Sequence, residues 1–359
     1  MEKIIRSAPG RIALVGNPFD IYGGSTISLT LKDLRSYVCL EKNNNPEQDI
    51  SSKIFKPGNN RPNEICQLEN AVIEELDLQY DYFKLFDVSD MPYESGLARS
   101  TAAVTAMINA FNEMFNLGIS DKRDVAEFAW RIERKLGVCG GQERYAIAHD
   151  DDERDYRILE RRINEADKKL EELEYTRPGK LFYMNFAGRE SHRFDNENYA
   201  IIEELKIPED LKIAAAYSKA KKSSFDCHKT LREIYKNSKK GRNIIDEYRD
   251  RSVLITNKAL GEFKRKSTSL EEIGNSMSGS LDLRFSMFKK LIKDDLGNSP
   301  KFKYDSICKE SISMKEIAES NGAYGVNQPG SKSIIFLYDD EMPIKELEKK
   351  GYHIIKIHK

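Results

Sequence analysis

Residues 7–24 carry the strongest indication of the fold, and they read Ser-Ala-Pro-Gly-Arg-Ile-Ala-Leu-Val-Gly-Asn-Pro-Phe-Asp-Ile-Tyr-Gly-Gly. Its short apolar run, Ile12 to Val15, predicts a buried strand bounded by turn residues. The loop that follows contains too many glycines and prolines for a helix or a strand, so its backbone can approach a ligand closely. Within it, Asp20 carries two oxygens that could accept hydrogen bonds from hydroxyl groups. Taken alone, the segment could also be an ordinary strand–turn–strand.

A second segment, Pro-Tyr-Glu-Ser-Gly-Leu-Ala-Arg-Ser-Thr-Ala-Ala at residues 92–103, leads into apolar positions at helical spacing. Small and hydroxyl residues therefore lie at the N-terminus of a predicted helix, where free N–H groups and the helix dipole favour phosphate. Ser100 could present its hydroxyl to a phosphate-bound magnesium ion. The alternative is that Ser100 only caps the helix. The segment is not a Walker loop, because it has no Gly-Lys-Ser/Thr.

Together the two segments resemble the substrate motif and the Pro-x-x-x-Gly-Leu-x-x-Ser-x-Ala phosphate loop of the GHMP kinase family. That family includes galactokinase, homoserine kinase, mevalonate kinase and phosphomevalonate kinase. Residues 16–32 look most like glucuronokinase, a sugar-1-kinase. Residues 133–146 are similar to the family's catalytic-acid loop, and residues 213–228 to the segment that opens its C-terminal half.

The resemblance implies an α+β, two-domain GHMP kinase fold with the active site between the domains. The N-terminal domain would be ribosomal protein S5 domain 2-like and the C-terminal domain α/β. We expect the domains to cover residues 1–205 and 206–359. Residues 150–177 carry a heptad stripe among charges and predict a helical insertion. This helix could form a homodimer arm, a lid over the site, or a charged helix on the protein's own surface.

By the same resemblance, the chain would be an ATP-dependent kinase, with ATP and Mg²⁺ as cofactors. It would phosphorylate the anomeric hydroxyl of a sugar. By the resemblance to glucuronokinase, this sugar would be a uronic acid such as glucuronate, and the product would be glucuronate 1-phosphate. The partners implied are this small sugar and ATP. One alternative is a kinase of the same family for a heptose phosphate or another small alcohol. Another is a homologue that binds nucleotide or sugar without catalysis.

The resemblance also implies roles for four residues in the transfer. Glu143 aligns with the family's catalytic aspartate and would accept the proton of the anomeric hydroxyl, with Asp150 as the rival candidate. Here the residue is Glu, and its loop is one residue short. Arg11 would stabilise charge on the transferred phosphoryl group. Ser100 and Glu133 would share the magnesium ion.

The binding residues follow from the same motifs. Asp20 and Asn17 would bind sugar hydroxyls, Tyr22 would stack on the sugar ring, and Arg144 or Arg99 would hold a uronate carboxylate. Arg99 stands where the family has a small residue, so it either points outward or adds charge beside the phosphates. The C-terminal loop at 322–331 is poorer in glycine than its family counterpart. The nucleotide phosphates would be held by Pro92, Gly96, Leu97, Ala98, Arg99, Ser100, Thr101 and Ala102.

Composition adds limits on partners and location. The 359 residues have a net charge of -1, which gives no general attraction to nucleic acid or an anionic membrane. No apolar run approaches the length of a membrane span, and no signal sequence precedes the first strand. Five scattered cysteines lack metal-ligand spacing and indicate a reducing cytoplasm.

The periodicity along the chain predicts strands within residues 1–42, at 181–186, 211–217, 333–338 and 352–357, and helices at 66–80, 100–117, 121–136 and 344–350, with a long helical region over 225–300.

Overall fold

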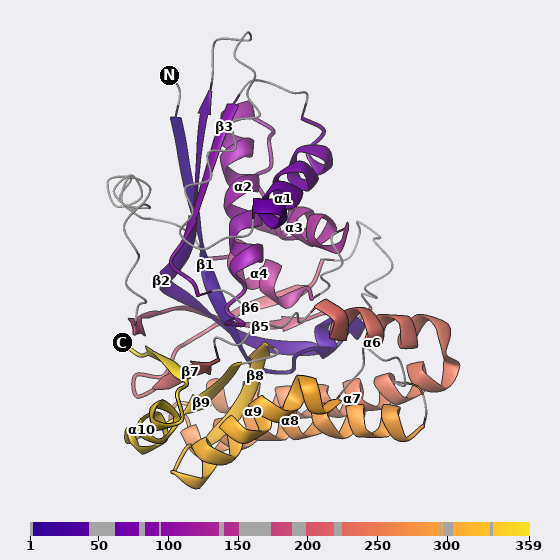
Figure 1. The fold of residues 1–359 in the computed structure, drawn as a ribbon, viewed down its shortest axis with the longest axis vertical. Coiled ribbons are helices and arrows are strands. Elements are labelled where there is room, and N and C mark those ends of the chain that lie inside the picture. Colours follow the sequence, from indigo (N-terminus) through magenta and orange to yellow (C-terminus); the bar gives the residue numbers. More distant parts are fainter. Residues whose placement is uncertain are drawn as a thin grey trace.

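The protein is described here by a computed structural model that covers residues 3–42, 62–78, 83–92, 95–135, 140–150, 174–188, 199–218, 225–294, 296, 304–330 and 333–359. These residues form two sheets with helices packed around them, in a mixed α+β architecture (Figure 1). Most of the predicted insertion, residues 151–173, lies outside the described residues.

The first sheet is antiparallel and has β2 at its centre. It contains β1 (Lys3–Val15), β2 (Ser25–Lys42), β3 (Phe83–Ser89), β5 (Pro178–Asn185) and β6 (Ile201–Leu205). β2 pairs with β1, β3 and β5, and β6 extends the sheet beyond β5. The apolar run at 12–15 is thus the end of a longer strand, and the glycine-rich loop after it connects β1 to β2. That loop contains one 3-10 turn, η1 (Phe19–Tyr22).

Helices α1 to α4 lie on one face of this sheet (Figure 1). They are α1 (Pro62–Glu75), α2 (Arg99–Phe115), α3 (Lys122–Lys135) and α4 (Gln142–Ala148). The helices predicted at 100–117 and 121–136 are confirmed to within two residues. The helix predicted at 66–80 begins and ends earlier than expected. It ends early because Asp77 has a left-handed backbone and Leu78 N–H donates to Ile73 C=O, as in a helix C-cap.

The second sheet has β7 near its centre and is formed mainly by the C-terminal half. Its order is β4 (Tyr175–Thr176), β10 (His353–Ile357), β7 (Ile213–Tyr217), β9 (Ser333–Leu337) and β8 (Gly325–Gly330). β7 is buried along its whole length, which fits its Ile-Ala-Ala-Ala-Tyr sequence. The strands predicted at 211–217, 333–338 and 352–357 are confirmed.

Five helices accompany this sheet among the described residues. They are α6 (Phe225–Asn237), α7 (Lys239–Phe263), α8 (Leu270–Lys293), α9 (Tyr304–Ser320) and α10 (Met342–Lys349). The long helical region predicted over 225–300 therefore consists of three helices. The breaks fall at Ser238 and Ser269, whose side chains accept hydrogen bonds from N–H groups of the following helix.

Several elements differ from the sequence prediction. Strands β3 and β6 and helix α9 lie where no element was predicted, and the predicted C-terminal loop at 322–331 contains strand β8. The predicted insertion helix cannot extend to 177, because Tyr175 and Thr176 form β4 and pair with β10. Strands β3 and β4 depend on pairing with β2 and β10, which lie far away in the sequence, so local periodicity does not indicate them.

The two halves share apolar packing. One buried cluster contains side chains of β1, β2 and α2 together with side chains of β7, β9 and β10. A second cluster lies among α6 to α10 and the second sheet, and it includes Phe19, Ile21 and Tyr22 of η1. The loop between β1 and β2 is therefore anchored in the C-terminal half. The boundary proposed at 205/206 falls between β6 and β7, where the chain passes from the first sheet to the second.

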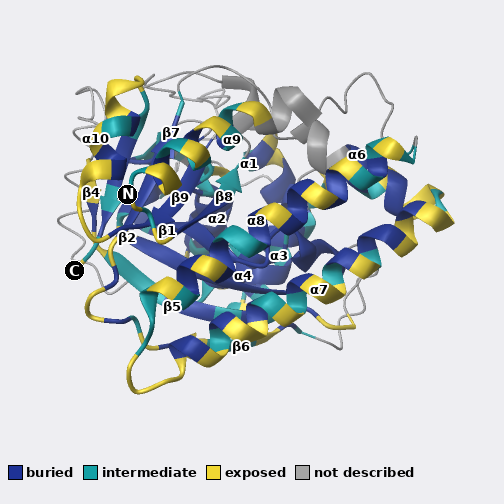
Figure 2. Ribbon diagram, turned by 90° about the horizontal axis from the view of Figure 1, so that it is seen from below, coloured by how far each residue is buried: buried dark blue, intermediate teal, exposed yellow. Residues whose placement is uncertain are grey.

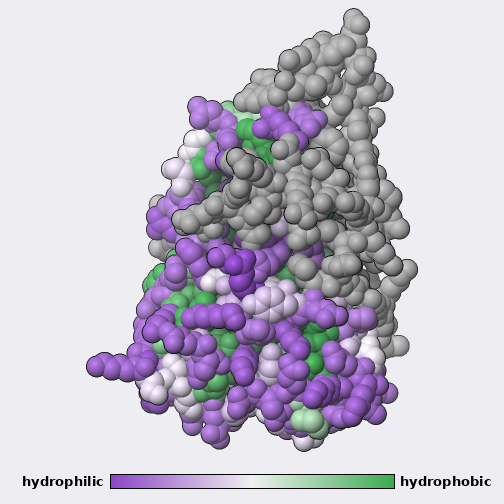
Figure 3. Space-filling model, turned by 90° about the vertical axis from the view of Figure 1, so that its left-hand side faces the viewer, coloured by the Kyte–Doolittle hydropathy of each residue, from purple (hydrophilic) through white to green (hydrophobic). Residues whose placement is uncertain are grey.

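Helices α7 and α8 bury one face and expose the other, while the strands beneath are mostly buried (Figure 2). On the face shown in Figure 3, hydrophilic residues predominate over the described part, and apolar residues are scattered among them. Within the described residues, no helix combines the length and apolar character needed to cross a membrane.

Candidate active site

Asp20 lies in η1 and faces the beginning of α4. Its Oδ2 accepts hydrogen bonds from the N–H groups of Gly141 at 2.7 Å and Gln142 at 3.1 Å, so the carboxylate caps a helix 121 residues away in the chain. Its Oδ1 is buried and has no hydrogen-bond partner among the described residues. Burial raises the pKa of Asp20, against the opposing effect of these N–H groups and of Arg11. One oxygen therefore holds the loop in place, and the other remains for a hydroxyl donor.

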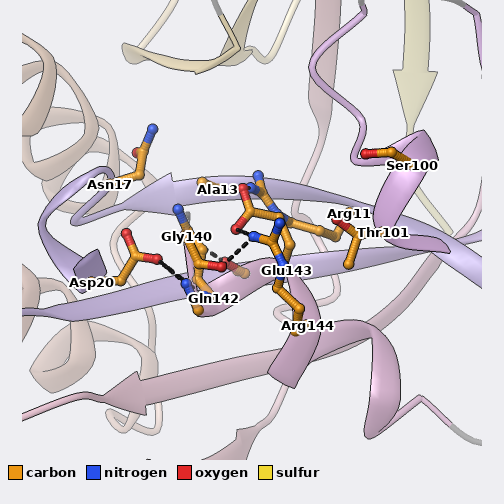
Figure 4. Close-up of polar contacts among 12 residues, drawn as sticks. Arg11, Ala13, Asn17, Asp20, Ser100, Thr101, Gly140, Gln142, Glu143 and Arg144 are labelled. Carbon is orange, nitrogen blue, oxygen red and sulfur yellow. Dashed lines mark hydrogen bonds and ion pairs between the residues drawn. The ribbon is translucent and has the colours of Figure 1, made fainter. Parts of the chain in front are cut away.

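Glu143, in the first turn of α4, forms an ion pair with Arg11 of β1. Arg11 is 1 % exposed, whereas the Glu143 side chain is 20 % exposed, so the carboxylate forms the accessible end of the pair. Burial lowers the pKa of Arg11 to about 9, which leaves it cationic at neutral pH. An ideal Cβ on Gly140 would lie 2.5 Å from Glu143 Oε2 and 3.0 Å from Asp20 Oδ2. The Asp20 and Glu143 carboxylates thus border the same residue (Figure 4).

The rival catalytic candidate, Asp150, lies elsewhere. It follows the C-terminal end of α4, where its N–H donates to Ile147 C=O. Its Oδ2 lies near Gly179 of β5. Glu143 is therefore the carboxylate that the fold places beside Arg11.

Glu133 in the last turn of α3 accepts hydrogen bonds from two hydroxyls of α2. Ser100 Oγ donates to its Oε1 at 2.9 Å, and Thr101 Oγ1 donates to its Oε2 at 2.8 Å. Glu133 is 1 % exposed, and it also forms an ion pair with Arg144. The structure thus brings together the two residues predicted to share a metal ion. It adds Thr101, which the sequence suggested only as part of the phosphate loop.

A magnesium ion fits this donor set. Mg²⁺ prefers oxygen ligands and usually takes one or two carboxylates, with waters and substrate phosphates as its remaining ligands. Ser100 and Glu133 offer a hydroxyl and a carboxylate at the start of α2, where the helix dipole favours phosphate. Among the described residues, no group of three or more His, Cys, Asp or Glu forms a metal site. Ser100 and Glu133 would hold the ion only together with a nucleotide.

Arg144 contacts both carboxylates of the site. It is 0 % exposed, and its guanidinium pairs with Glu133 through Nη2 and with Glu143 through Nη1, at 3.0 Å from Glu143 Oε2. Nη1 also donates to the Gly140 carbonyl. The sequence interpretation had Arg144 bind a uronate carboxylate. In the structure the guanidinium contacts two protein carboxylates and a carbonyl, while its Nε and Nη2 make no hydrogen bond among the described residues, so the binding of a substrate carboxylate by Arg144 stays a prediction.

The predicted phosphate loop is held against both β1 and the C-terminal half. Arg11 N–H donates to Leu97 C=O at 3.0 Å. Gly96 has a φ of +77°, and an ideal Cβ on it would lie 2.9 Å from Gly330 N and 2.4 Å from Ser333 Oγ. Only glycine fits here, because the loop packs against the last residue of β8 and the first residue of β9. Ala98 also has a left-handed backbone (φ 62°) and precedes α2, so the loop turns sharply into the helix.

Two predicted sugar-binding residues are engaged by protein. The Asn17 amide donates to Gln328 C=O at 2.7 Å and accepts from Asn327 Nδ2 at 2.8 Å, which ties the loop to β8. Tyr22 is 2 % exposed, and its ring lies 4.7 Å from that of Tyr235, measured between centroids. Tyr22 therefore presents no open ring face in this structure. Asn327 was missed by sequence analysis, because nothing local distinguishes it.

Arg99 turns back along the chain, and its Nη1 donates to Met91 C=O at 3.2 Å. This contact places the guanidinium beside the start of the predicted phosphate loop, and the choice between the two alternatives stays a prediction. Its charge acts on Asp87 of β3, whose Oδ1 is buried without a hydrogen-bond partner among the described residues. Burial raises the pKa of Asp87 to about 6, although Arg99 opposes the shift.

Asp87→Asn is expected to change how stability depends on pH. The ordinary pKa of Asp, about 3.9, is lower than the folded value, so the native state binds this proton more tightly than the unfolded state does. Stability should therefore fall as pH rises from about 4 to about 6. Because the Asp87 side chain is partly exposed, we expect the variant to gain about 1 kcal/mol relative to wild type across this range. Urea unfolding at pH 4 and pH 7 would measure it, and a constant difference between the two proteins would contradict it.

Residues 67–150 match the family model for the GHMP kinases N terminal domain. Over 164 residues the chain is 27 % identical to a D-glycero-α-D-manno-heptose 7-phosphate kinase of Campylobacter jejuni, a match that covers 41 % of this chain and 48 % of that protein. Over 159 residues it is 29 % identical to Glucuronokinase 1 of Arabidopsis thaliana, covering 38 % and 44 %. The chain thus spans about half the length of the curated relatives it matches.

Solved structures share the fold over nearly the whole chain. A D-glycero-D-manno-heptose 1-phosphate kinase from Bacteriodes thetaiotaomicron has a TM-score of 0.57 at 19 % identity, over 98 % of this chain and 95 % of that one. Galactokinase from Lactococcus lactis has a TM-score of 0.60 at 14 % identity, over 99 % and 92 %. Mevalonate kinase from L. major has a TM-score of 0.61 at 15 % identity, over 100 % and 96 %. Residues 67–150 are therefore similar to the GHMP kinases N terminal domain, and the chain shares the fold of these solved GHMP kinases over nearly its whole length.

Proposed function

We propose that this protein is an ATP-dependent sugar kinase that phosphorylates an anomeric hydroxyl. The observation that carries the proposal is the contact of one guanidinium, that of Arg144, with both Glu133 and Glu143. Arg144 thus connects Glu133, the carboxylate suited to bind a metal–nucleotide complex, with Glu143, the carboxylate suited to accept a proton.

In the proposed reaction, the sugar hydroxyl oxygen attacks the γ-phosphorus of ATP, the bond to the bridging oxygen breaks, and ADP leaves. Glu143 accepts the hydroxyl proton, and Arg11 beside it stabilises negative charge near the transferred group. The N-terminus of α2 holds the nucleotide phosphates. A magnesium ion held by Ser100 and Glu133 would neutralise phosphate charge. Asp20 would accept a hydrogen bond from a further sugar hydroxyl through Oδ1.

The preferred substrate in this proposal is a uronic acid such as glucuronate. It is supported by the resemblance of residues 16–32 to glucuronokinase and by the match to Glucuronokinase 1. A heptose phosphate is the second candidate, because the match to the heptose 7-phosphate kinase covers a similar share of the chain.

The test is ADP release by the purified full chain with Mg-ATP and a panel of acceptors. The panel contains glucuronate, galacturonate, common hexoses, a heptose 7-phosphate and mevalonate. We expect turnover with glucuronate, and phosphorus NMR of the product should place the phosphate on the anomeric oxygen. Turnover only with the heptose phosphate would support the second candidate. ATP binding in calorimetry without turnover of any acceptor would contradict the kinase and favour a non-catalytic binding protein.

A further inference from the structure

We propose that Arg144 is a positioning residue that divides one guanidinium between the metal-binding carboxylate and the proton-accepting carboxylate. By doing so it holds Glu143 in place and weakens the affinity of Glu133 for a divalent cation. The roles of the two carboxylates rest on the proposed function. The contacts of Arg144 do not depend on it.

The contacts of Arg144 join three segments. Nη2 pairs with Glu133 at the end of α3, and Nη1 contacts both Glu143 at the start of α4 and the Gly140 carbonyl that precedes it. Because the guanidinium is planar, the hydrogen bonds from Nη1 to Glu143 and to the Gly140 carbonyl fix its orientation. Nη2, which makes no hydrogen bond among the described residues, is thereby held beside Glu133 as an ion pair. A lysine ammonium has no such fork and could not fix two carboxylates in the same way.

The charges around Arg144 explain why its loss should have two opposite effects. Three carboxylates, those of Asp20, Glu133 and Glu143, meet two cations, Arg11 and Arg144. Arg144 is the cation in contact with Glu133 among the described residues, so it competes with a metal ion for that carboxylate. Without Arg144, Glu133 should bind a divalent cation more tightly, and Glu143 should lose one of its two cationic contacts. General damage to the site would instead weaken both metal binding and turnover.

The experiment compares Arg144→Gln and Arg144→Lys with wild type in two measurements on the full chain. The first is Mn²⁺ affinity of the protein with ADP, followed by the EPR signal of free Mn²⁺. It requires no turnover. The second is kcat and KM with the acceptor identified in the panel. Glu133→Gln serves as the control that should lose Mn²⁺ affinity. Arg123→Gln removes an exposed arginine paired with Asp121 and serves as the control for loss of an ion pair.

For Arg144→Gln we expect Mn²⁺ to bind at least about threefold more tightly, while kcat falls about 10- to 100-fold. Arg144→Lys keeps the charge, so its Mn²⁺ affinity should stay within about twofold of wild type. Its kcat should still fall about tenfold, because the fork is lost. The Arg123 control should match wild type in both measurements.

Weaker Mn²⁺ binding together with lower kcat in Arg144→Gln would overturn the proposal, and so would wild-type kcat in Arg144→Lys. If Arg144→Gln does not fold, Arg144→Lys decides the question alone, because it keeps the charge and loses the forked guanidinium. The proposal then requires unchanged Mn²⁺ affinity together with a lower kcat. Where no acceptor is turned over, the proposed function fails by itself. Tighter Mn²⁺ binding in Arg144→Gln would then still support the division of the guanidinium, and unchanged binding would overturn it.

Discussion

Glu143→Gln is expected to lower kcat by about 10²- to 10⁴-fold, the effect of removing a general base. Glutamine keeps the length of the side chain and an oxygen that can accept a hydrogen bond from Arg11, so the local packing should persist. It cannot take up the hydroxyl proton. The affinity for ATP should change little, because the predicted phosphate contacts come from α2 and Glu133. Initial rates of ADP release and calorimetry with ATP would measure the two effects separately.

Glu143→Asp is the matched control for this variant. It keeps the carboxylate and restores the residue type of the family motif, and it should retain more activity than Glu143→Gln. A Glu143→Gln protein with wild-type kcat would remove Glu143 from the chemistry. Asp150 would not replace it readily, because it lies at the opposite end of α4, near Gly179.

Gly16→Ala is expected to destabilise the protein by about 3 kcal/mol or more, through backbone strain and overpacking together. Gly16 has a φ of +96°, and an ideal Cβ on it would lie 2.1 Å from Ser25 C=O and 2.9 Å from Thr256 Oγ1. Its N–H also donates to Ser280 Oγ at 3.0 Å. The residue therefore packs between the start of β2 and helices α7 and α8. Making room for a Cβ atom would require the backbone of β2 or one of these helices to shift, which costs free energy. Urea unfolding followed by circular dichroism would measure the loss.

Gly118→Ala separates the two causes. Gly118 also has a positive φ, +73°, yet nothing lies within 4 Å of its ideal Cβ. Its substitution should cost only the backbone strain, about 1 kcal/mol. An equal loss of unfolding free energy in the two variants would show that backbone strain alone acts at Gly16. Its close approach to β2 and α7 would then contribute nothing to the destabilisation.

The sequence located the parts of the site that depend on local pattern. Apolar spacing after residue 100 predicted helix α2, and Ser100 at its start lies beside Glu133, the residue with which the resemblance implied that it shares a metal ion. The motif also paired Arg11 with Glu143 in one site, and these two residues form an ion pair. Such features can be found because periodicity and motif spacing are properties of neighbouring residues.

Local pattern failed where pairing or contact with another element determines the structure of a segment. Residues 325–330 contain glycine and proline and so resembled a loop, but pairing with β9 makes them strand β8. Asn17 is predicted to bind the sugar, and the contacts that the structure adds join its amide to Asn327 and Gln328 of β8. Tyr22 was assigned to the sugar ring, and its ring packs on Tyr235. Both of these residues of the β1–β2 loop are thus in contact with the C-terminal half.

The sequence by itself determined the helices and strands with clear periodicity, the phosphate-loop motif, and the identities of the acidic and basic residues available for catalysis. Only the tertiary structure decided which of these residues face one another. Arg144 illustrates the difference. Its fork-shaped guanidinium suggested a ligand for a uronate carboxylate, and its ion pair with Glu133 on another helix makes it part of the protein's own charge network. The physical reason is that a buried charge takes the partner that folding brings within a few ångströms, and sequence spacing alone does not fix that partner.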